Sequence, residues 1–465
     1  MARVLVTGAS GYIGGHLVAA LLRDGQQVRV LTRHADGLRA EPWVGQVEVV
    51  EGDASAAADC RRALAGVEAA YYLLHSMDGG SDFVRRERDM ASTFASAAEY
   101  SRVARIVYLG GLHPGGELSE HLGSRVEVGK VFLAGAVPAV VFQAGVVLGA
   151  GSASFDMLRH LTERLPAMVA PRWVQNRIQP IAIADVLHYL VGALRLPADV
   201  NRTFDIGCPE VLTYAQMMRR YAADVGLRRR YVVTVPVLTP RLAGLWIDLV
   251  TPISSGIARP LVGSLVHDAV CREDDVLEAI GPPPGGRTGF DEAIAAAAAD
   301  IDPLRWSRTL GRTAAIVAAS AVTGSVLTNP GSAWYTGLRK PAWQPPPVAF
   351  PLVWTSLYTS TAVATALASA DLAEDGKRAA SNSLERALAV NMALNTAWTA
   401  IFFRAHKPTL ATVECAVLCL STVDLARRAG VTGGGKAATI GAYAAWCAFA
   451  GTLSAGVARL NPGCN

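Results

Sequence analysis

The chain has 465 residues, 51% of them hydrophobic, and a formal net charge of +4. This length suits two or three domains, and so small a charge, with no basic tract of interleaved aromatics, argues against a nucleic-acid partner. The seven cysteines include no Cys-x-x-Cys or Cys/His spacing of a zinc site, so no metal site is predicted.

A glycine-rich turn near the N-terminus predicts a nucleotide site. The chain opens on a short apolar strand, without a signal-peptide pattern, so we expect a cytoplasmic first domain. Thr-Gly-x-x-Gly-x-x-Gly follows at 7–14, then an apolar-periodic helix and a strand at 28–31. Gly8 permits the tight turn, Gly11 lets the backbone approach a pyrophosphate, and Gly14 lets the helix pack on the strand. The predicted cofactor contacts here are Thr7, Gly8, Ser10, Gly11, Tyr12, Ile13 and Gly14.

This spacing resembles the extended or atypical short-chain dehydrogenase/reductase superfamily, which implies a doubly wound α/β Rossmann domain. Arg33 follows the second strand, where an Asp or Glu would hold a free ribose 2′-hydroxyl. An arginine suits a 2′-phosphate and favours NADP(H) over NAD(H), with a solvated loop arginine as the alternative. Asp53, in Glu-Gly-Asp-Ala, resembles the family's turn beside the adenine. Strands at 69–74 and 105–109 continue the alternation of strand and helix.

The resemblance weakens at the catalytic residues. The superfamily uses a Tyr-x-x-x-Lys pair, but the partner position of Lys130 holds Val126. The domain therefore resembles atypical members that bind a dinucleotide without obvious turnover, and whether it is an enzyme stays open. Candidate replacements are His75, Ser124 and Lys130, the first two near the ends of predicted strands, where open sheets place ligands. A hydrogen-bonded structural histidine is the alternative for His75.

Composition divides the rest of the chain. An apolar stretch at 235–270, interrupted by prolines, predicts either amphipathic helices on the membrane or packing on the Rossmann core, and the prolines favour the second. A Pro/Gly run at 281–286 marks a boundary. We expect a nucleotide-binding domain over 1–300, a linker over 301–312 and a membrane domain over 313–465.

The last third of the chain predicts a membrane domain. Only 18 Asp, Glu, Lys and Arg residues occur from Leu310 onward. About 20 apolar residues cross a bilayer, which predicts an all-α bundle of five spans, at 313–338, 341–370, 387–403, 408–426 and 437–458. Nine basic residues flank the spans on the side of the N-terminus and five on the other, which places the first domain in the cytoplasm.

Aromatic residues recur in this region in five separated segments. These are Trp334 to Pro346, Val353 to Tyr358, Leu394 to Phe403, Tyr443 to Ala450 and Leu460-Asn461. Their order resembles the TspO/MBR (tryptophan-rich sensory/translocator) family over about 306–462. Two positions depart from the family pattern, since Ala442 replaces a proline and Ser454 an asparagine. The resemblance also implies pairing into a homodimer.

The resemblance implies a flat hydrophobic ligand, such as a porphyrin or a sterol-like molecule. Tryptophan faces stack on such molecules and each indole N–H adds one polar contact. An interfacial belt is the alternative role of these residues. Glu414, within a span, is either a packing partner or a functional acid. The predicted ligand-binding residues are Trp343, Pro345, Pro346, Trp354, Tyr358, Asn395, Trp398, Tyr443 and Trp446.

We therefore expect a membrane protein that binds a porphyrin- or sterol-like ligand in a Trp-rich bundle. Its cytoplasmic domain would bind NADP(H) and either sense cellular reductant or handle the ligand. The alternative is a membrane-tethered NADPH-dependent oxidoreductase acting on a lipid or tetrapyrrole. In a third interpretation both halves are scaffolds. Consumption of NADPH that depends on a substrate separates the enzyme from the sensor.

Overall fold

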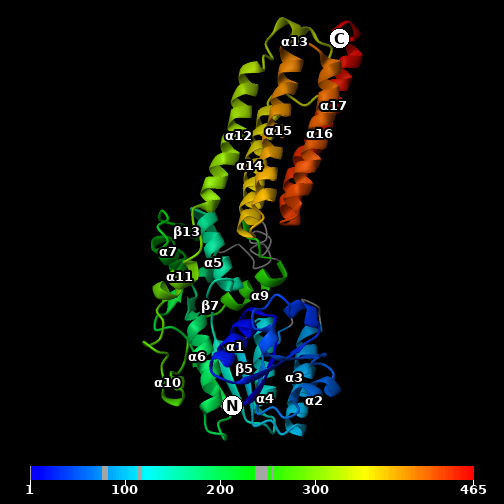
Figure 1. Ribbon diagram of the computed structural model, residues 1–465. Helices are drawn as coiled ribbons and strands as arrows, with labels where there is room; N and C mark the ends of the chain where they lie inside the picture. The colour runs from blue at the N-terminus through cyan, green and yellow to red at the C-terminus, as the bar shows by residue number, and fades with distance from the viewer. Residues whose placement is uncertain (1, 76–81, 114–117, 236–249, 254, 465) are drawn as a thin grey trace. The chain divides into compact units, whose positions relative to one another are not determined.

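The computed structural model describes every residue except 1, 76–81, 114–117, 236–249, 254 and 465 (Figure 1). The chain divides into two compact units. The first extends to Ile301, apart from a short segment before Ile253. The second extends from Asp302 and includes residues 250–252 of that segment.

The first unit is built on a seven-stranded sheet in the order β11-β6-β5-β4-β1-β2-β3, in which every pair is parallel. From β1 the chain builds outward through β2 and β3, then returns to β4 on the other side of β1. The order reverses there, and ligands of open α/β sheets bind outside the carboxyl ends of the strands at such a point. The predicted doubly wound fold is confirmed. The strands are β1 (Arg3–Thr7), β2 (Gln27–Thr32), β3 (Glu48–Glu51), β4 (Ala69–Tyr72), β5 (Arg105–Gly111), β6 (Ala139–Ala144) and β11 (Arg202–Ile206).

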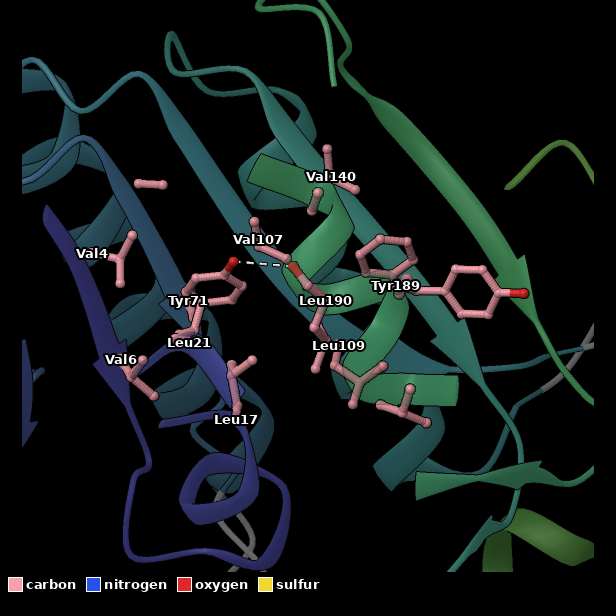
Figure 2. Close-up of a cluster of buried hydrophobic side chains, with 14 of the residues drawn as sticks. Val4, Val6, Leu17, Leu21, Tyr71, Val107, Leu109, Val140, Tyr189 and Leu190 are labelled. Atoms are coloured by element: carbon pink, nitrogen blue, oxygen red, sulfur yellow. Dashed lines mark hydrogen bonds between the residues drawn. The ribbon is translucent and has the colours of Figure 1, made fainter. Parts of the chain in front are cut away.

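Helices cover both faces of this sheet. Side chains alternate along the strands, so Val4 and Val6 face a core with α1 (Tyr12–Arg23) and α6 (Ile183–Gly192). Figure 2 shows this core, in which the Tyr71 hydroxyl donates to the carbonyl of Leu190 at 3.0 Å. The opposite face packs under α2 (Ala57–Leu64), α3 (Phe83–Tyr100) and α4 (Glu120–Leu133).

Smaller elements complete the first unit. Three two-stranded sheets pair β10 with β7, β12 with β9 and β13 with β8. Within the proline-interrupted stretch, α9 packs on α4 and α5, which agrees with packing on the Rossmann core; residues 236–249 lie outside the described part. The bounds are β7 (Val147–Leu148), α5 (Ala153–Arg164), β8 (Ala167–Pro171), β9 (Arg177–Ile178), β10 (Ile181–Ala182), β12 (Leu212–Thr213), α7 (Tyr214–Asp224), β13 (Tyr231–Val235), α9 (Ser255–Leu265), α10 (Val276–Ala279) and α11 (Phe290–Ala298).

The second unit is a bundle of five long helices that run alongside one another (Figure 1). A single short helix lies in the loop after the first of them. Contacts join α12 to α14 and α15, α14 to α17, and α16 to α15 and α17. The bounds are α12 (Arg305–Leu327), α13 (Ala333–Gly337), α14 (Ala349–Glu374), α15 (Arg378–Phe403), α16 (Pro408–Gly430) and α17 (Gly434–Leu460).

Several helix ends differ from the predicted spans. The expected linker over 301–312 is helical from Arg305, where arginines of the first turns pair with Asp302 and Glu374. The first helix ends at Leu327, before an Asn-Pro-Gly turn that cannot continue it. The third helix begins at 378 rather than 387, because Glu385 pairs with Arg312 of α12 and is thereby accommodated.

Three of the helices, α12, α16 and α17, are long and apolar enough to cross a membrane. Helices α14 and α15 have 26 residues each, a length of about 39 Å that also exceeds a bilayer's hydrocarbon thickness. The described bundle therefore contains three clear membrane-spanning candidates, and five spans stays a prediction.

Candidate functional site

The glycine-rich turn has room for backbone only. Gly8 has a φ of +73°, and a Cβ there would lie 2.6 Å from the carbonyl oxygen of Leu73. A Cβ at Gly14 would lie 2.1 Å from the carbonyl oxygen of Gly8. Both distances are shorter than any real contact, so β1 and α1 approach this closely only because these positions lack side chains. Gly11 is exposed and its N–H donates to the Gly8 carbonyl at 3.0 Å, which closes the turn.

Helix α1 directs its N-terminus at this turn. Its N-cap is Gly11, and no side chain caps the helix. The first N–H groups, from Tyr12 onward, are therefore available to a phosphate. Thr7 also has a structural role, because its Oγ1 donates to the carbonyl of Tyr71 and accepts from the N–H of Leu73, each at 3.1 Å. Thr7 is fully buried, so it joins β1 to β4 at the point where the strand order reverses.

Tyr12 extends from this turn towards the loop after β7. A Cβ at Gly149 would lie 2.2 Å from the Tyr12 hydroxyl, and the ring packs on His16 with centroids 4.7 Å apart. Among the described residues the hydroxyl has no hydrogen-bond partner. Burial, with a smaller effect of Asp156, raises the pKa of Tyr12 to about 12. The phenol is thus a neutral group beside the nucleotide turn.

Arg33 and Asp53 come together at the ends of β2 and β3. The backbone N–H of Ser55 donates to Asp53 Oδ1 at 2.8 Å and lowers the pKa of the Asp53 carboxyl. The positive charge of Arg33 lowers that pKa further. Because Thr32 pairs with Glu51, both residues follow the ends of adjacent strands. Arg33 is exposed and Asp53 half-buried. A cation and an anion thus stand where the adenosine half of a dinucleotide is expected.

The three candidate catalytic residues do not form one constellation. Ser124 is 1% exposed, and its hydroxyl donates to the buried carboxylate of Glu87 on α3. Lys130 is exposed and pairs with Glu127 at 2.7 Å. Of the three, only His75 lies at the end of a sheet strand, just after β4.

Sequence reasoning missed Arg125, which precedes the valine in the tyrosine position. Its Nη1 lies 3.7 Å from where a Cβ on Gly111 would stand, at the carboxyl end of β5. Burial and the charge of Arg125 lower the pKa of His75 to about 3, and both also lower the pKa of His121. No described carboxylate lies within ion-pair distance of Arg125. The only sequence signal was its place one residue before the missing dyad member.

Polar side chains also lie near the carboxyl ends of β6 and β11. The Nη2 of Arg272 donates to Gln143 Oε1 at 3.0 Å, and the Arg272 backbone N–H donates to Asp205 Oδ2 at 2.8 Å. Gln143 also lies 3.4 Å from Nε2 of His113. Since Gln143 and Asp205 are both buried, these contacts fix Arg272 at the strand ends. Arg125 and Arg272 therefore lie near the carboxyl ends of β5, β6 and β11.

In the second unit a hydrogen-bonded chain connects three helices. The hydroxyl of Tyr358 on α14 donates to Asn395 Oδ1 on α15 at 2.6 Å. Asn395 Nδ2 then donates to the hydroxyl of Tyr443 on α17 at 3.0 Å. Asn395 and Tyr443 are buried, which sets the relative register of these helices. The predicted residues Tyr358, Asn395 and Tyr443 are thus brought together.

Aromatic rings surround this chain in one cluster. The distance between ring centroids is 5.2 Å from Trp354 to Tyr358, 5.9 Å from Trp354 to Tyr443 and 6.4 Å from Trp354 to Trp446. Phe449 extends the cluster, at 5.1 Å from Trp446 and 5.9 Å from the exposed Trp343. These spacings are those of favourable edge and offset contacts.

Trp398 belongs to a second cluster, and the proline-rich loop lies over α17. The Trp398 ring stacks on Phe402 with centroids 5.3 Å apart. Trp343 also packs on α17, since a Cβ on Gly456 would lie 3.6 Å from its ring. Pro345 is half-buried and Pro346 exposed. The predicted binding residues therefore divide between a main cluster, a neighbouring one and a covering loop.

Comparison with known proteins identifies the second unit. Residues 313–460 match the model of the TspO/MBR family. Over 154 residues the chain is 35% identical to Protein CrtK of Rhodobacter capsulatus, an alignment that covers 31% of this chain and 88% of that protein. The chain belongs to the TspO/MBR family.

The TspO/MBR bundle is fused to an NAD(P)H-binding Rossmann domain, since residues 8–134 match a model described as NAD(P)H-binding. Over 242 residues the chain is 28% identical to Ceramide reductase of Caulobacter vibrioides, covering 49% of this chain and 72% of that protein. The solved structure of a Citrobacter sp. triphenylmethane reductase superimposes with a TM-score of 0.51 at 17% identity, covering 63% of this chain and 99% of that chain. At that identity the likeness shows the fold alone.

The TspO/MBR domain also buries polar groups that lack partners. The indole Nε1 atoms of Trp398 and Trp446 and both carboxyl oxygens of Glu414 have no hydrogen-bond partner among the described residues. Ser454, which replaces the family's asparagine, is 2% exposed. Buried polar groups are normally paired, so these groups are candidates for contacts with a bound molecule.

Proposed function

We propose that this TspO/MBR protein binds NADP(H) in its first unit and a flat hydrophobic molecule of porphyrin or sterol type in its bundle, and that the two binding events are coupled. The aromatic cluster around Tyr358, Asn395 and Tyr443 carries the proposal, because it combines stacking faces with a polar chain. The charge of the loops favours a cytoplasmic first unit. A homodimer is part of this proposal and comes from the family resemblance.

NADP(H) is favoured over NAD(H) by Arg33. Its guanidinium is exposed after β2, beside Asp53, and can approach a 2′-phosphate. The nucleotide turn supplies the pyrophosphate site through the free N–H groups of α1. In this proposal the Tyr12 hydroxyl, which has no described partner, faces the bound cofactor.

The experiment is a fluorescence titration of the full-length protein in detergent with NADPH, with and without protoporphyrin IX. Coupling predicts that porphyrin changes the affinity for NADPH, and by the same factor NADPH changes the affinity for porphyrin. Equal NADPH affinities in the two titrations would remove the coupling. Absence of NADPH binding would overturn the assignment of the nucleotide site.

A second candidate function is a membrane-bound NADPH-dependent reductase of a lipid or tetrapyrrole. The observation that favours it is the likeness to Ceramide reductase over most of the first unit. NADPH supplies a hydride when bound. Arg125, which lies at the end of β5 without a described ion pair, would stabilise negative charge that develops on a substrate oxygen.

Loss of NADPH absorbance over time separates the two functions. Loss that requires a ceramide-type ketone or a porphyrin supports the reductase, and Arg125→Met should then reduce kcat. Binding of both ligands without loss of NADPH supports the coupled sensor.

A further inference from the structure

A carboxyl group lies inside the helical bundle without a partner. Glu414 stands on α16, which is apolar and long enough to cross a membrane, and the residue is 9% exposed. Neither carboxyl oxygen makes a hydrogen bond to a described residue. An acid buried in this way within a span is costly, and such residues usually mark a ligand or ion site.

Hydrogen bonds between helices fix the height of Glu414 in the bundle. Asn391 on α15 donates from Nδ2 to Thr422 Oγ1 on α16 at 2.9 Å. The two helices form a hairpin and run antiparallel. Thr399 lies eight residues after Asn391 on α15, and Glu414 lies eight residues before Thr422 on α16, so these two residues are also at one height. Glu414 therefore stands about one helical turn from Asn395 of the Tyr–Asn–Tyr chain.

The unpaired indoles lie at neighbouring heights. Trp398 precedes Thr399 on α15. On α17, the carbonyl of Cys447 accepts from the thiol of Cys415 at 3.3 Å, which brings Trp446 close in height to Glu414. Three polar groups without described partners thus come from three helices.

The chemistry of these groups selects the ligand. An indole only donates a hydrogen bond, whereas the ionised form of Glu414, which a cationic partner would favour, only accepts. The buried lysine of the bundle, Lys436, is already paired with Asp371, so it cannot serve as counter-ion. A ligand nitrogen that donates, above all a cationic one, satisfies Glu414, because charge-assisted hydrogen bonds are the strong ones.

We propose that Glu414 binds the nitrogen of a flat hydrophobic ligand that carries an ammonium or N–H donor, with the rings held by the neighbouring tryptophans. This inference rests on the proposed ligand site in the bundle and names the ligand's polar group. A purely hydrocarbon ligand would stack on the same rings but leave Glu414 unpaired.

The test compares two flat three-ring probes, cationic 9-aminoacridine and neutral anthracene, by quenching of tryptophan fluorescence in the full-length detergent-solubilised protein. We expect 9-aminoacridine to bind more tightly. Glu414→Gln should weaken its binding about 10-fold or more and leave anthracene unchanged. Glu414→Leu, which removes every polar atom, should do the same. Asp424→Asn is the matched control, since that carboxylate on the same helix is half-exposed and paired with arginines.

Unchanged binding of 9-aminoacridine to Glu414→Gln or Glu414→Leu would overturn the inference, while persistent anthracene binding would leave the proposed ligand site standing. If neither variant folds, the wild-type comparison decides, because equal affinity for the two probes contradicts a role for the carboxyl. Failure of the folded wild type to bind either probe or a porphyrin contradicts the proposed function itself.

Discussion

The two units provide their candidate sites by opposite means. In the first, the backbone forms the site: Gly8 and Gly14 have no room for a side chain, and the free N–H groups of α1 face the turn. In the second, side chains form it, because Trp354, Asn395 and Tyr443 come from three separate helices. A backbone site is specified by a few consecutive residues, whereas a side-chain site depends on the register of helices distant in sequence.

The strongest test of this contrast is Gly14→Ala. The added Cβ would lie 2.1 Å from a backbone oxygen, so β1 and α1 must separate. We expect NADPH binding to weaken about 100-fold or more, with porphyrin binding intact, measured by the two fluorescence titrations. Gly37→Ala, where a Cβ meets nothing within 4 Å, is the control. Normal NADPH affinity in Gly14→Ala would show that this turn does not form the site.

The nucleotide turn was predictable because its requirements are local. Gly8 and Gly14, which the spacing singled out, have no room for a side chain in the structure, and the parallel sheet follows from alternating strands and helices. The position of Arg125, in the same domain, was not predictable. Arg125 lies at the end of β5 only because α4 packs on that strand, and Lys130, further along the same helix, faces solvent. No local pattern distinguishes these two outcomes.

The next largest effect should come from Trp354→Ala. Trp354 contacts three rings of the main cluster, and loss of a central tryptophan costs about 2 kcal/mol, or about 30-fold in porphyrin affinity. NADPH binding should stay within twofold. Trp334→Ala is the comparison, since Trp334 stacks on His406 outside that cluster. Equal losses in the two variants would favour an interfacial belt over a binding pocket.

Which aromatic residues meet was only partly predictable. The motifs identify the residues, but the assignment of Trp398 to a second cluster with Phe402 depends on the packing of α15 against its neighbours. The helix ends were also partly hidden. The apolar span predicted at 387–403 begins after Glu385 and Arg386, whereas the helix begins at Arg378 and Glu385 pairs with Arg312.

Arg33→Ala should have a smaller effect and refine the description of the first unit. The loss of one exposed charge-assisted contact is expected to weaken NADPH binding about 10-fold and to leave NADH binding unchanged. Parallel titrations with the two cofactors measure the change in preference. Arg39→Ala is the matched control, because that arginine is exposed and pairs with Asp36. Equal losses for NADPH and NADH would mean that Arg33 contributes general positive charge rather than recognition of a phosphate.

The smallest effect concerns stability and separates the units by their pH dependence. Burial, with the neighbouring Asp291 carboxyl, raises the pKa of Asp224 to about 6. A carboxyl whose pKa is higher in the folded state than in the unfolded one stabilises the fold at low pH, and the fold loses this contribution as pH rises through 6. Because Asp224 is exposed, we expect Asp224→Asn to raise the stability of the first unit by only a few tenths of a kcal/mol at pH 7.5. The gain should disappear at pH 4.5 or below, and thermal melts monitored by bound NADPH can follow it. A stability gain of Asp224→Asn that grows as pH falls would contradict the assigned direction of the pKa shift. An equal shift of the melting temperature in melts monitored by bound porphyrin would show that the two units unfold together.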